Sequence, residues 1–395
     1  MKIVQVTPYV IKIRTNARGG VYWFFVKVET DTNITGWGEI YWNSFEPGLY
    51  KKMVMAVADE FLIGEDPFSI EKFFIRVFTK LGHWHGDLAL TGIVSGLEMA
   101  CWDIMGKALD RPVYDLLGGK VNERIRTYSY LTEKNDAIWC EDYWQMEDAL
   151  LERAHELVEM GFTGIKLDPF SPYVDNIAPS EPNLQMLSRS VRTIRRLREE
   201  VCGDRCDIII GTHGQFTASG AIRVARQLEP YDPLWFEEPT PPENYLALKK
   251  VSKKTSIPIA AGERLATKWE YMPLINSQSV DIVQLDVSGM GGLLEAKKIA
   301  AIADAAHMQI TPHFWAGPIN FAAQIQLDVT CTNFLIQESI EKMDTHGLDT
   351  LLKKPFVWED GYIIPSNEPG LGIELDEELV EKYSIDSFDE KNILL

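Results

Sequence analysis

Acidic side chains and a histidine recur at the ends of short apolar stretches in the second half of this chain of 395 residues. They are Glu237, Glu263, Asp286, His313 and Glu338, each about 25 residues from the next, roughly the length of one strand and one helix. In a barrel of alternating strands and helices, the ends of successive strands surround one mouth. The spacing therefore predicts that these five side chains share one site.

Two of these residues, Glu237 and Glu263, fall on adjacent predicted strands. Two carboxylates buried side by side are costly unless a cation neutralises them. Carboxylate oxygens are hard ligands that suit Mg²⁺, so the pair predicts a magnesium site. The alternative is that either glutamate makes an ordinary ion pair with Arg264 or with a lysine in a loop.

The elements that must position these side chains lie between residues 124 and 351, where short apolar strands alternate with helices. This alternation is typical of a parallel sheet built from strand–helix units, and eight such strands predict an α/β barrel. The predicted strands span residues 124–131, 164–168, 207–211, 234–237, 257–263, 281–286, 309–313 and 334–338.

The first 123 residues have a different pattern and predict a separate α+β domain. Alternating apolar and polar residues indicate strands over residues 3–13, 22–30 and 36–39, and longer apolar periodicity indicates helices near 47–63, 68–80 and 90–109. The last segment, 352–395, contains no further strand–helix unit. We expect it to return to the first domain.

Composition limits the partners of the chain. Its 58 acidic and 39 basic residues give a net charge of −19, which disfavours nucleic acid and anionic membranes. Five scattered cysteines fit a reducing cytoplasm better than a disulfide-bonded secreted fold. Residues 88–105 are strongly apolar, but Glu98 and Asp103 among them favour a buried helix over a membrane span. We therefore expect a cytoplasmic protein that acts on a small molecule.

Motifs around the acidic series are more specific than its spacing. The barrel motifs are residues 235–239 (Trp-Phe-Glu-Glu-Pro), 261–264 (Ala-Gly-Glu-Arg), 284–286 (Gln-Leu-Asp) with glycines 291 and 292, and 312–313 (Pro-His). The first domain contains residues 36–39 (Gly-Trp-Gly-Glu) and 100–103 (Ala-Cys-Trp-Asp), followed by Gly106 and Lys107. Together they resemble the enolase superfamily, and within it the mandelate racemase subgroup and its acid-sugar dehydratases of the galactonate dehydratase type.

The resemblance implies a modified (β/α)₇β barrel of the TIM type with an α+β N-terminal capping domain. It also implies that Mg²⁺ holds both oxygens of a substrate carboxylate and stabilises the enediolate formed when the neighbouring carbon loses its proton. Glu237 and Glu263 are then metal ligands. Where the family usually has an aspartate ligand on the third strand, this chain has Gly211. His213, two residues further on, matches the general acid of the dehydratases or is itself the third metal ligand.

The second strand bears on the identity of the base. Family members with a lysine base carry Lys-x-Lys there, whereas this chain has Lys166 and Asp168. His313 is therefore the expected base, with Asp286 orienting its imidazole. Lys166 then serves as a cation near the substrate carboxylate, and Glu338 matches the family's hydrogen-bonding acid on the last strand. Asp168 either orients Lys166 or holds a substrate hydroxyl.

Substrate contacts are expected from the loops of the capping domain, where the family places its specificity loops. Arg18 lies in the segment 14–20, Trp42 in 42–44 and His85 in the cluster 83–85. These residues, with Asp168 and Arg264, are the predicted substrate-binding set. The capping-domain loops are alternatively ordinary surface.

These inferences predict a Mg²⁺-dependent dehydratase of an aldonate or aldarate. His313 would remove the proton next to the carboxylate and His213 would protonate the departing C3 hydroxyl, which gives a 2-keto-3-deoxy acid. The alternatives are an epimerase or cycloisomerase of a sugar acid, which the missing second lysine disfavours, and a non-catalytic sugar-acid-binding protein. The resemblance also implies a homo-oligomer.

Overall fold

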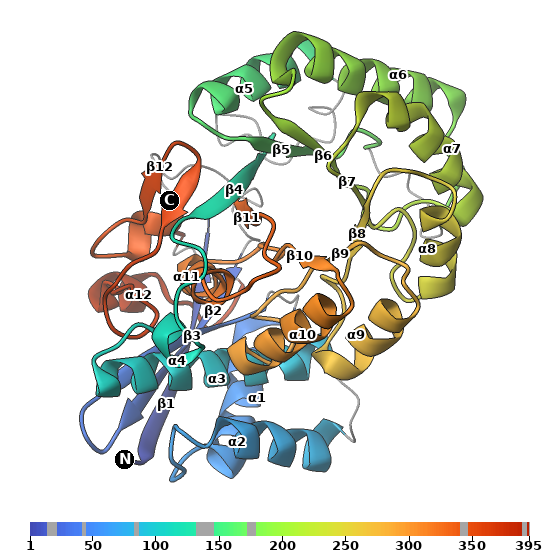
Figure 1. Ribbon diagram of the computed structural model, residues 1–395. Coiled ribbons are helices and arrows are strands. Elements are labelled where there is room, and N and C mark those ends of the chain that lie inside the picture. The colour runs from blue at the N-terminus through green and yellow to red at the C-terminus, as the bar shows by residue number, and fades with distance from the viewer. Residues whose placement is uncertain are drawn as a thin grey trace.

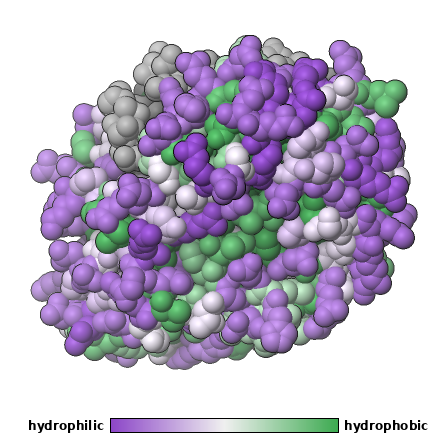
Figure 2. All heavy atoms as spheres, turned by 45° about the horizontal axis from the view of Figure 1, so that its top comes forward, coloured by the Kyte–Doolittle hydropathy of each residue, from purple (hydrophilic) through white to green (hydrophobic). Residues whose placement is uncertain are grey.

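The computed structural model describes residues 1–13, 22–41, 45–82, 87–131, 146–171, 179–339, 347–388 and 393–394. Figure 1 shows two parts, an N-terminal sheet with its helices and a larger ring of strands surrounded by helices. Most of the face shown in Figure 2 is hydrophilic, with apolar residues gathered in a hollow near its centre. The described cysteines Cys101, Cys202, Cys206 and Cys331 are buried and free of disulfides.

The N-terminal part is an antiparallel sheet of three strands, in the order β1-β2-β3, packed against helices. This confirms the predicted α+β pattern. The strands are β1 (Ile3–Lys12), β2 (Tyr22–Thr30) and β3 (Thr35–Ile40), and the helices are α1 (Pro47–Phe61), α2 (Ile70–Val77), the π-helical turn η1 (Phe78–Gly82), α3 (Leu88–Leu109) and α4 (Val113–Leu116). By its length and its apolar composition, helix α3 could span a membrane. However, 83% of its apolar 18-residue stretch is buried inside the fold.

All eight predicted barrel strands are present, and neighbours along the chain pair in parallel. They are β4 (Ile125–Tyr130), β5 (Gly164–Leu167), β6 (Asp207–Ile210), β7 (Trp235–Glu237), β8 (Ile259–Ala261), β9 (Ile282–Val283), β10 (Gln309–Ile310) and β11 (Gln337–Ser339). Strand β11 pairs with β4, and a single bridge between Ile310 and Phe334 links β10 to the segment leading into β11. The last strand therefore returns to the first.

Within the described residues, seven helices alternate with these strands and lie on the outside of the ring (Figure 1). They are α5 (Glu147–Glu159), α6 (Leu184–Arg196), α7 (Ala218–Leu228), α8 (Tyr245–Ser252), α9 (Thr267–Asn276), α10 (Leu293–Ala305) and α11 (Pro318–Asp328), with the short turns η3 (Leu197–Cys202) and η4 (Glu229–Tyr231). Several begin at a side chain that caps the first turn, as Asn183, Thr217 and Asn244 do for α6, α7 and α8. Because helices cover the outside and side chains fill the inside, most residues of the barrel strands are buried. Strands β8 and β9 are entirely apolar, whereas β11 is polar and buried.

The C-terminal segment only partly follows the prediction that it returns to the first domain. After the turn η5 (Leu348–Leu351), strands β12 (Val357–Glu359) and β13 (Tyr362–Ile364) form a hairpin that pairs antiparallel with barrel strand β4. The chain then reaches the N-terminal part, where α12 (Glu377–Tyr383) contacts β1 and Ser384 bridges Ile11. The hairpin binds the barrel because β4 offers an edge that β11 and β5 do not cover at its start. The domain limits 1–123, 124–351 and 352–395 stay a prediction.

Two glutamates of the N-terminal part cap barrel helices. Glu98 on α3 accepts hydrogen bonds from the backbone N–H groups of Leu293 (2.8 Å) and Leu294 (3.0 Å) at the start of α10. Glu39 in β3 accepts from Gly317 (2.5 Å) and Asn320 (2.8 Å) at the start of α11. The first turns of helices leave N–H groups without intrahelical partners, so these carboxyl groups satisfy donors that the barrel itself leaves open.

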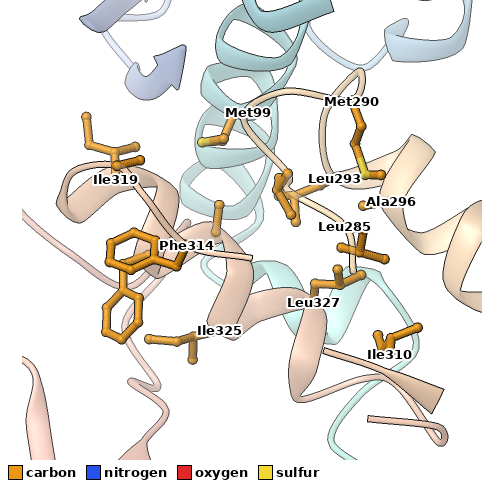
Figure 3. Close-up of a cluster of buried hydrophobic side chains, with 14 of the residues drawn as sticks. Met99, Leu285, Met290, Leu293, Ala296, Ile310, Phe314, Ile319, Ile325 and Leu327 are labelled. Atoms are coloured by element: carbon orange, nitrogen blue, oxygen red, sulfur yellow. The ribbon is translucent and has the colours of Figure 1, made fainter. Parts of the chain in front are cut away.

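Glycine at the N-cap of both helices makes this contact possible. A Cβ atom at Gly292 would overlap the Glu98 carboxyl group, and one at Gly317 would lie 2.7 Å from Glu39 Oε1. Figure 3 shows that apolar side chains pack around the same region, with Met99 of α3 close to residues of the loops and helices at the end of the barrel. The two parts of the molecule are therefore joined by buried hydrogen bonds as well as by packing.

Replacing Glu98 by alanine is expected to destabilise the fold by about 2 to 4 kcal/mol, because two buried backbone donors and the Trp102 indole N–H lose their acceptor. Equilibrium urea unfolding measures the change. Glu152→Ala on the exposed face of α5 is the matched control, with an expected effect below about 0.5 kcal/mol. Equal effects of the two substitutions would contradict the role of Glu98.

Candidate active site

The predicted catalytic and metal-binding residues lie at or just beyond the carboxyl ends of the barrel strands, in chain order. The strands β9 and β10 are shorter than predicted, so Asp286 and His313 stand in the loops that follow them. Except for His213, whose side chain is 37% exposed, each of these residues is at most 8% exposed. Their charges are consequently removed from water and must be balanced by one another or by a ligand.

Lys166 occupies the centre of the site. Its Nζ lies 2.5 Å from Glu237 Oε1 and 2.9 Å from Glu338 Oε1, so one ammonium group joins β5, β7 and β11. The other oxygens of the two glutamates accept from Trp235 Nε1 (2.9 Å) and from the backbone of Phe314 (2.8 Å). Burial alone would lower the pKa of Lys166, but the two glutamates outweigh it and hold the pKa well above its ordinary value. The lysine therefore stays charged.

His313 and Asp286 form the predicted pair. His313 Nδ1 lies 2.8 Å from Asp286 Oδ2, and Asp286 Oδ1 in turn accepts from the backbone (2.9 Å) and hydroxyl (2.6 Å) of Ser288 and from Asn320 Nδ2 (3.2 Å). Gln324 Nε2 donates to the backbone carbonyl of His313 at 2.7 Å. These bonds fix the imidazole so that its Nε2 faces Glu263, 4.0 Å away.

The charges in the site raise the basicity of His313. Burial would lower its pKa, but the carboxylate of Glu263 and the hydrogen bond to Asp286 outweigh burial and raise the pKa to about 10. Conversely, burial would raise the pKa of Glu263, but the positive charges of His313, His213 and Lys166 outweigh that effect and lower it to about 2. These charges therefore favour the ionised form of Glu263 and the protonated form of His313.

Glu263 carries the clearest sign of a ligand. Its Oε2 is buried and has no hydrogen-bond partner among the described residues. His313 Nε2 lies 4.0 Å from this oxygen, which is an ion pair too long to be a hydrogen bond, and a buried ionised oxygen that accepts no hydrogen bond is costly. A hard divalent cation held by Glu263 and Glu237 would satisfy it.

The carboxylate oxygens of Glu237 and Glu263 therefore suit Mg²⁺, although the side chains are not gathered around one point. Among the described residues, no three Asp, Glu, His or Cys side chains lie close enough to one another to form a ready metal site. One reason is that Glu237 is engaged by Lys166. Binding a cation would require this ion pair to loosen.

The third strand departs from the usual ligand pattern in space as well as in sequence. A Cβ atom at Gly211 would overlap Asp168 Oδ1, so the Asp168 carboxylate stands where a side chain of residue 211 would begin. The Tyr130 hydroxyl donates to the same oxygen at 2.9 Å. His213 Nδ1 lies 3.6 Å from Asp168 Oδ2, and Asp168 and Glu263 raise the pKa of His213 against the opposing effect of burial.

Arg264 pairs with Glu238 and not with the two predicted metal ligands. Its Nη2 and Nε lie 2.6 Å and 3.2 Å from the Glu238 oxygens. The sequence suggested, as an alternative, that Glu237 pairs with Arg264 or with a lysine in a loop. Glu237 instead pairs with Lys166, which lies in strand β5. Contact of Arg264 with substrate stays a prediction.

Three predicted substrate-binding residues, Arg18, Trp42 and His85, lie outside the described residues. The sequence reasoning also missed Tyr130, which contacts Asp168 and has its ring centroid 5.0 Å from Lys166 Nζ. Tyr130 is the last residue of β4, so applying the strand-end rule to the first strand as well would have found it.

Cavity size does not locate this site. A surface groove of about 1320 Å³ lies between the C-terminal segment and the N-terminal part and is lined by residues such as Trp37, Lys107 and Lys354. None of the predicted catalytic residues lines it. The buried charges identify the barrel mouth as the better candidate for chemistry.

Comparisons with known proteins agree along almost the whole chain. The family model "Mandelate racemase / muconate lactonizing enzyme, N-terminal domain" matches residues 1–118, and the model "Enolase C-terminal domain-like" matches residues 149–379. The D-galactonate dehydratase of Pectobacterium atrosepticum is 32% identical over 99% of this chain and 97% of its own length. The D-gluconate/D-galactonate dehydratase of Picrophilus torridus is 36% identical over 82% of this chain and 79% of its own.

A solved structure is similar over its full length. The crystal structure of a candidate mandelate racemase/muconate lactonizing enzyme from Labrenzia alexandrii DFL-11 has a TM-score of 0.93 and 42% identity to this chain. It is matched over 100% of this chain and 99% of its own.

Replacing Asp286 by asparagine is expected to lower the pKa of His313 by about 1 to 3 pH units, because the imidazolium loses a charged hydrogen-bond partner. Titration of the histidine ring signals by NMR in metal-free protein measures it. Asp304→Asn, at an exposed position of α10, is the control and is expected to leave His313 unchanged. An unchanged His313 titration in Asp286→Asn would contradict the pairing.

Proposed function

Because the chain belongs to the mandelate racemase/muconate lactonizing enzyme family of the enolase superfamily, we propose that it is a Mg²⁺-dependent dehydratase of an acid sugar. The substrate is an aldonate or aldarate, and the product is a 2-keto-3-deoxy acid. The named dehydratases among its relatives support this reaction class.

One observation carries the proposal: two histidines, each beside an aspartate, follow different barrel strands, and His313 Nε2 lies 4.0 Å from the buried carboxylate of Glu263. His313 and His213 both lower the pKa of Glu263, and each has an aspartate beside it, Asp286 and Asp168. Dehydration needs a base that removes one proton and an acid that delivers one to the leaving hydroxyl. Two histidines around one point of the barrel mouth meet that requirement.

His313 is the proposed base. Its Nδ1 is held by Asp286, so Nε2 is the atom that takes the α-proton. The pKa of about 10 depends strongly on the charge of Glu263, so neutralising Glu263 favours the unprotonated imidazole that a base requires. The C–H electron pair is first delocalised into the substrate carboxylate as an enediolate, and it then forms the C2–C3 double bond as the C3–O bond breaks.

His213 is the proposed acid and delivers its proton to the departing C3 hydroxyl, which leaves as water. The resulting enol becomes the keto acid by proton transfer from solvent. Lys166 places positive charge near the substrate carboxylate, and Glu338 holds Lys166 in position. When bound between Glu237 and Glu263, Mg²⁺ would offset the negative charge that develops on the substrate carboxylate as the α-proton leaves.

A panel of aldonic and aldaric acids tests the reaction directly. Purified protein with Mg²⁺ is expected to form a keto acid from at least one member, and chelation with EDTA is expected to stop it. Keto-acid detection by semicarbazide measures the product. No product from any member would contradict the proposal, and α-deuteration in D₂O without loss of water would favour epimerisation.

Separate roles for the two histidines predict separate defects. His313→Asn is expected to lower kcat by about 10²- to 10⁴-fold and to abolish exchange of the α-proton with D₂O. His213→Asn is expected to lose dehydration to a similar extent while keeping that exchange. NMR of recovered substrate measures exchange, and His155→Asn, at an exposed position of α5, is the control with normal activity. Exchange that survives in His313→Asn would contradict its role as the base.

A further inference from the structure

We infer that Asp168, from the end of β5, supplies the third carboxylate ligand of the divalent cation and takes the space of the side chain that Gly211 lacks on β6. The inference rests on the proposed function only in that the site binds a cation. It assigns the missing ligand to a neighbouring strand.

Strand pairing places the two residues side by side. Strands β5 and β6 are parallel, with Leu167 opposite Ile210, and the Gly211 N–H donates to the Leu167 carbonyl at 3.0 Å. Asp168 directly follows Leu167 of β5, and Gly211 directly follows Ile210 of β6. A carboxylate on either of them therefore reaches the same part of the barrel mouth.

A side chain at 211 would compete with the Asp168 carboxylate for the same space. Any Cβ atom at residue 211 would overlap Asp168 Oδ1 and would lie 3.3 Å from both Lys166 Cε and the Tyr130 hydroxyl oxygen. The overlapping atom is the far end of the Asp168 side chain, so an aspartate at 211 would force the Asp168 carboxylate to move away from β6. Glycine at 211 is thus the condition for the Asp168 carboxylate to stand in front of β6.

The surroundings of Asp168 suit a metal ligand. Its side chain is 1% exposed, and the Tyr130 hydroxyl donates to Oδ1 at 2.9 Å, which is the kind of outer hydrogen bond that orients a ligating carboxylate. Going round the barrel, the acidic groups then follow in the order Asp168, Glu237 and Glu263, from β5, β7 and β8, with the Asp168 carboxylate displaced toward β6. Among the described residues these three carboxylates are not gathered into one metal site, so a bound cation would have to draw them together.

Evidence that the barrel mouth takes a cation comes from Glu263, whose buried Oε2 has no hydrogen-bond partner among the described residues. Mg²⁺ prefers oxygen ligands in octahedral geometry. Asp168 offers oxygen, whereas His213 would offer nitrogen from a side chain that is 37% exposed. The carboxylate is therefore the better third ligand of the two.

Metal affinity measured without substrate tests the assignment. Mg²⁺ binding is followed by calorimetry, and free Mn²⁺ is counted by EPR as a second probe. Asp168→Asn is expected to weaken binding of both ions at least about tenfold, equivalent to about 1.4 kcal/mol. The double variant Asp168→Gly with Gly211→Asp returns a carboxylate to β6 without the overlap, and is expected to recover most of the affinity.

Two further variants separate this assignment from its alternatives. His213→Asn is expected to bind Mg²⁺ as the unchanged protein does, and Asp207→Asn, at the opposite end of β6 and paired with Arg126, is the matched aspartate control. Circular dichroism and thermal unfolding without metal check that each variant is folded.

Several outcomes would overturn the inference. Normal Mg²⁺ affinity in Asp168→Asn would do so and would leave Asp168 to hold a substrate hydroxyl. A loss of Mg²⁺ affinity in His213→Asn, or a folded double variant that does not recover binding, would also do so. So would an unsubstituted protein that binds neither ion. A protein that binds Mg²⁺ through Asp168 but dehydrates no acid sugar would contradict only the proposed function. The two ideas therefore fail separately.

Discussion

Negative charge buried at the carboxyl ends of the barrel strands is the constraint around which the site is arranged. Glu237, Glu263, Asp286 and Glu338 are each at most 6% exposed, so each needs a partner of opposite charge or a hydrogen-bond donor. Lys166 serves two of them, and His313 joins the other two at 2.8 Å and 4.0 Å. The carboxylates still outnumber these cations, which is the electrostatic condition that a divalent cation would relieve.

The same constraint connects the site to the N-terminal part of the molecule. Asp286 and His313 stand in the loops that lead into α10 and α11, and those helices begin on carboxyl groups supplied by Glu98 and Glu39. Each loop is therefore anchored at its far end by a residue of the other part. The position of the base and its partner depends on how the two parts dock, and the glycines at the two N-caps give the carboxyl groups access.

The inferred ligand Asp168 follows a different strand from Gly211, the position at which the family usually has an aspartate ligand. Parallel strands in register bring the residues that follow β5 and β6 to one place, so a carboxylate from either strand can reach it. The residue pattern of the third barrel strand alone shows only that the aspartate ligand is absent at Gly211. The compensating residue is found 43 positions earlier in the chain, because position in space and not in sequence defines a ligand.

The sequence by itself determined the eight barrel strands, the N-terminal strands and helices, and the order of polar residues around the mouth. These features depend on local apolar periodicity and on the rule that parallel strand ends converge, and both are written along the chain. Only the tertiary structure decided that Lys166 binds Glu237 and Glu338, that Arg264 binds Glu238, and that the hairpin of β12 and β13 joins β4. Each of these contacts joins residues from separate elements. Packing in three dimensions settles which of several available charges or edges pair with one another, because burial makes an unpaired charge costly.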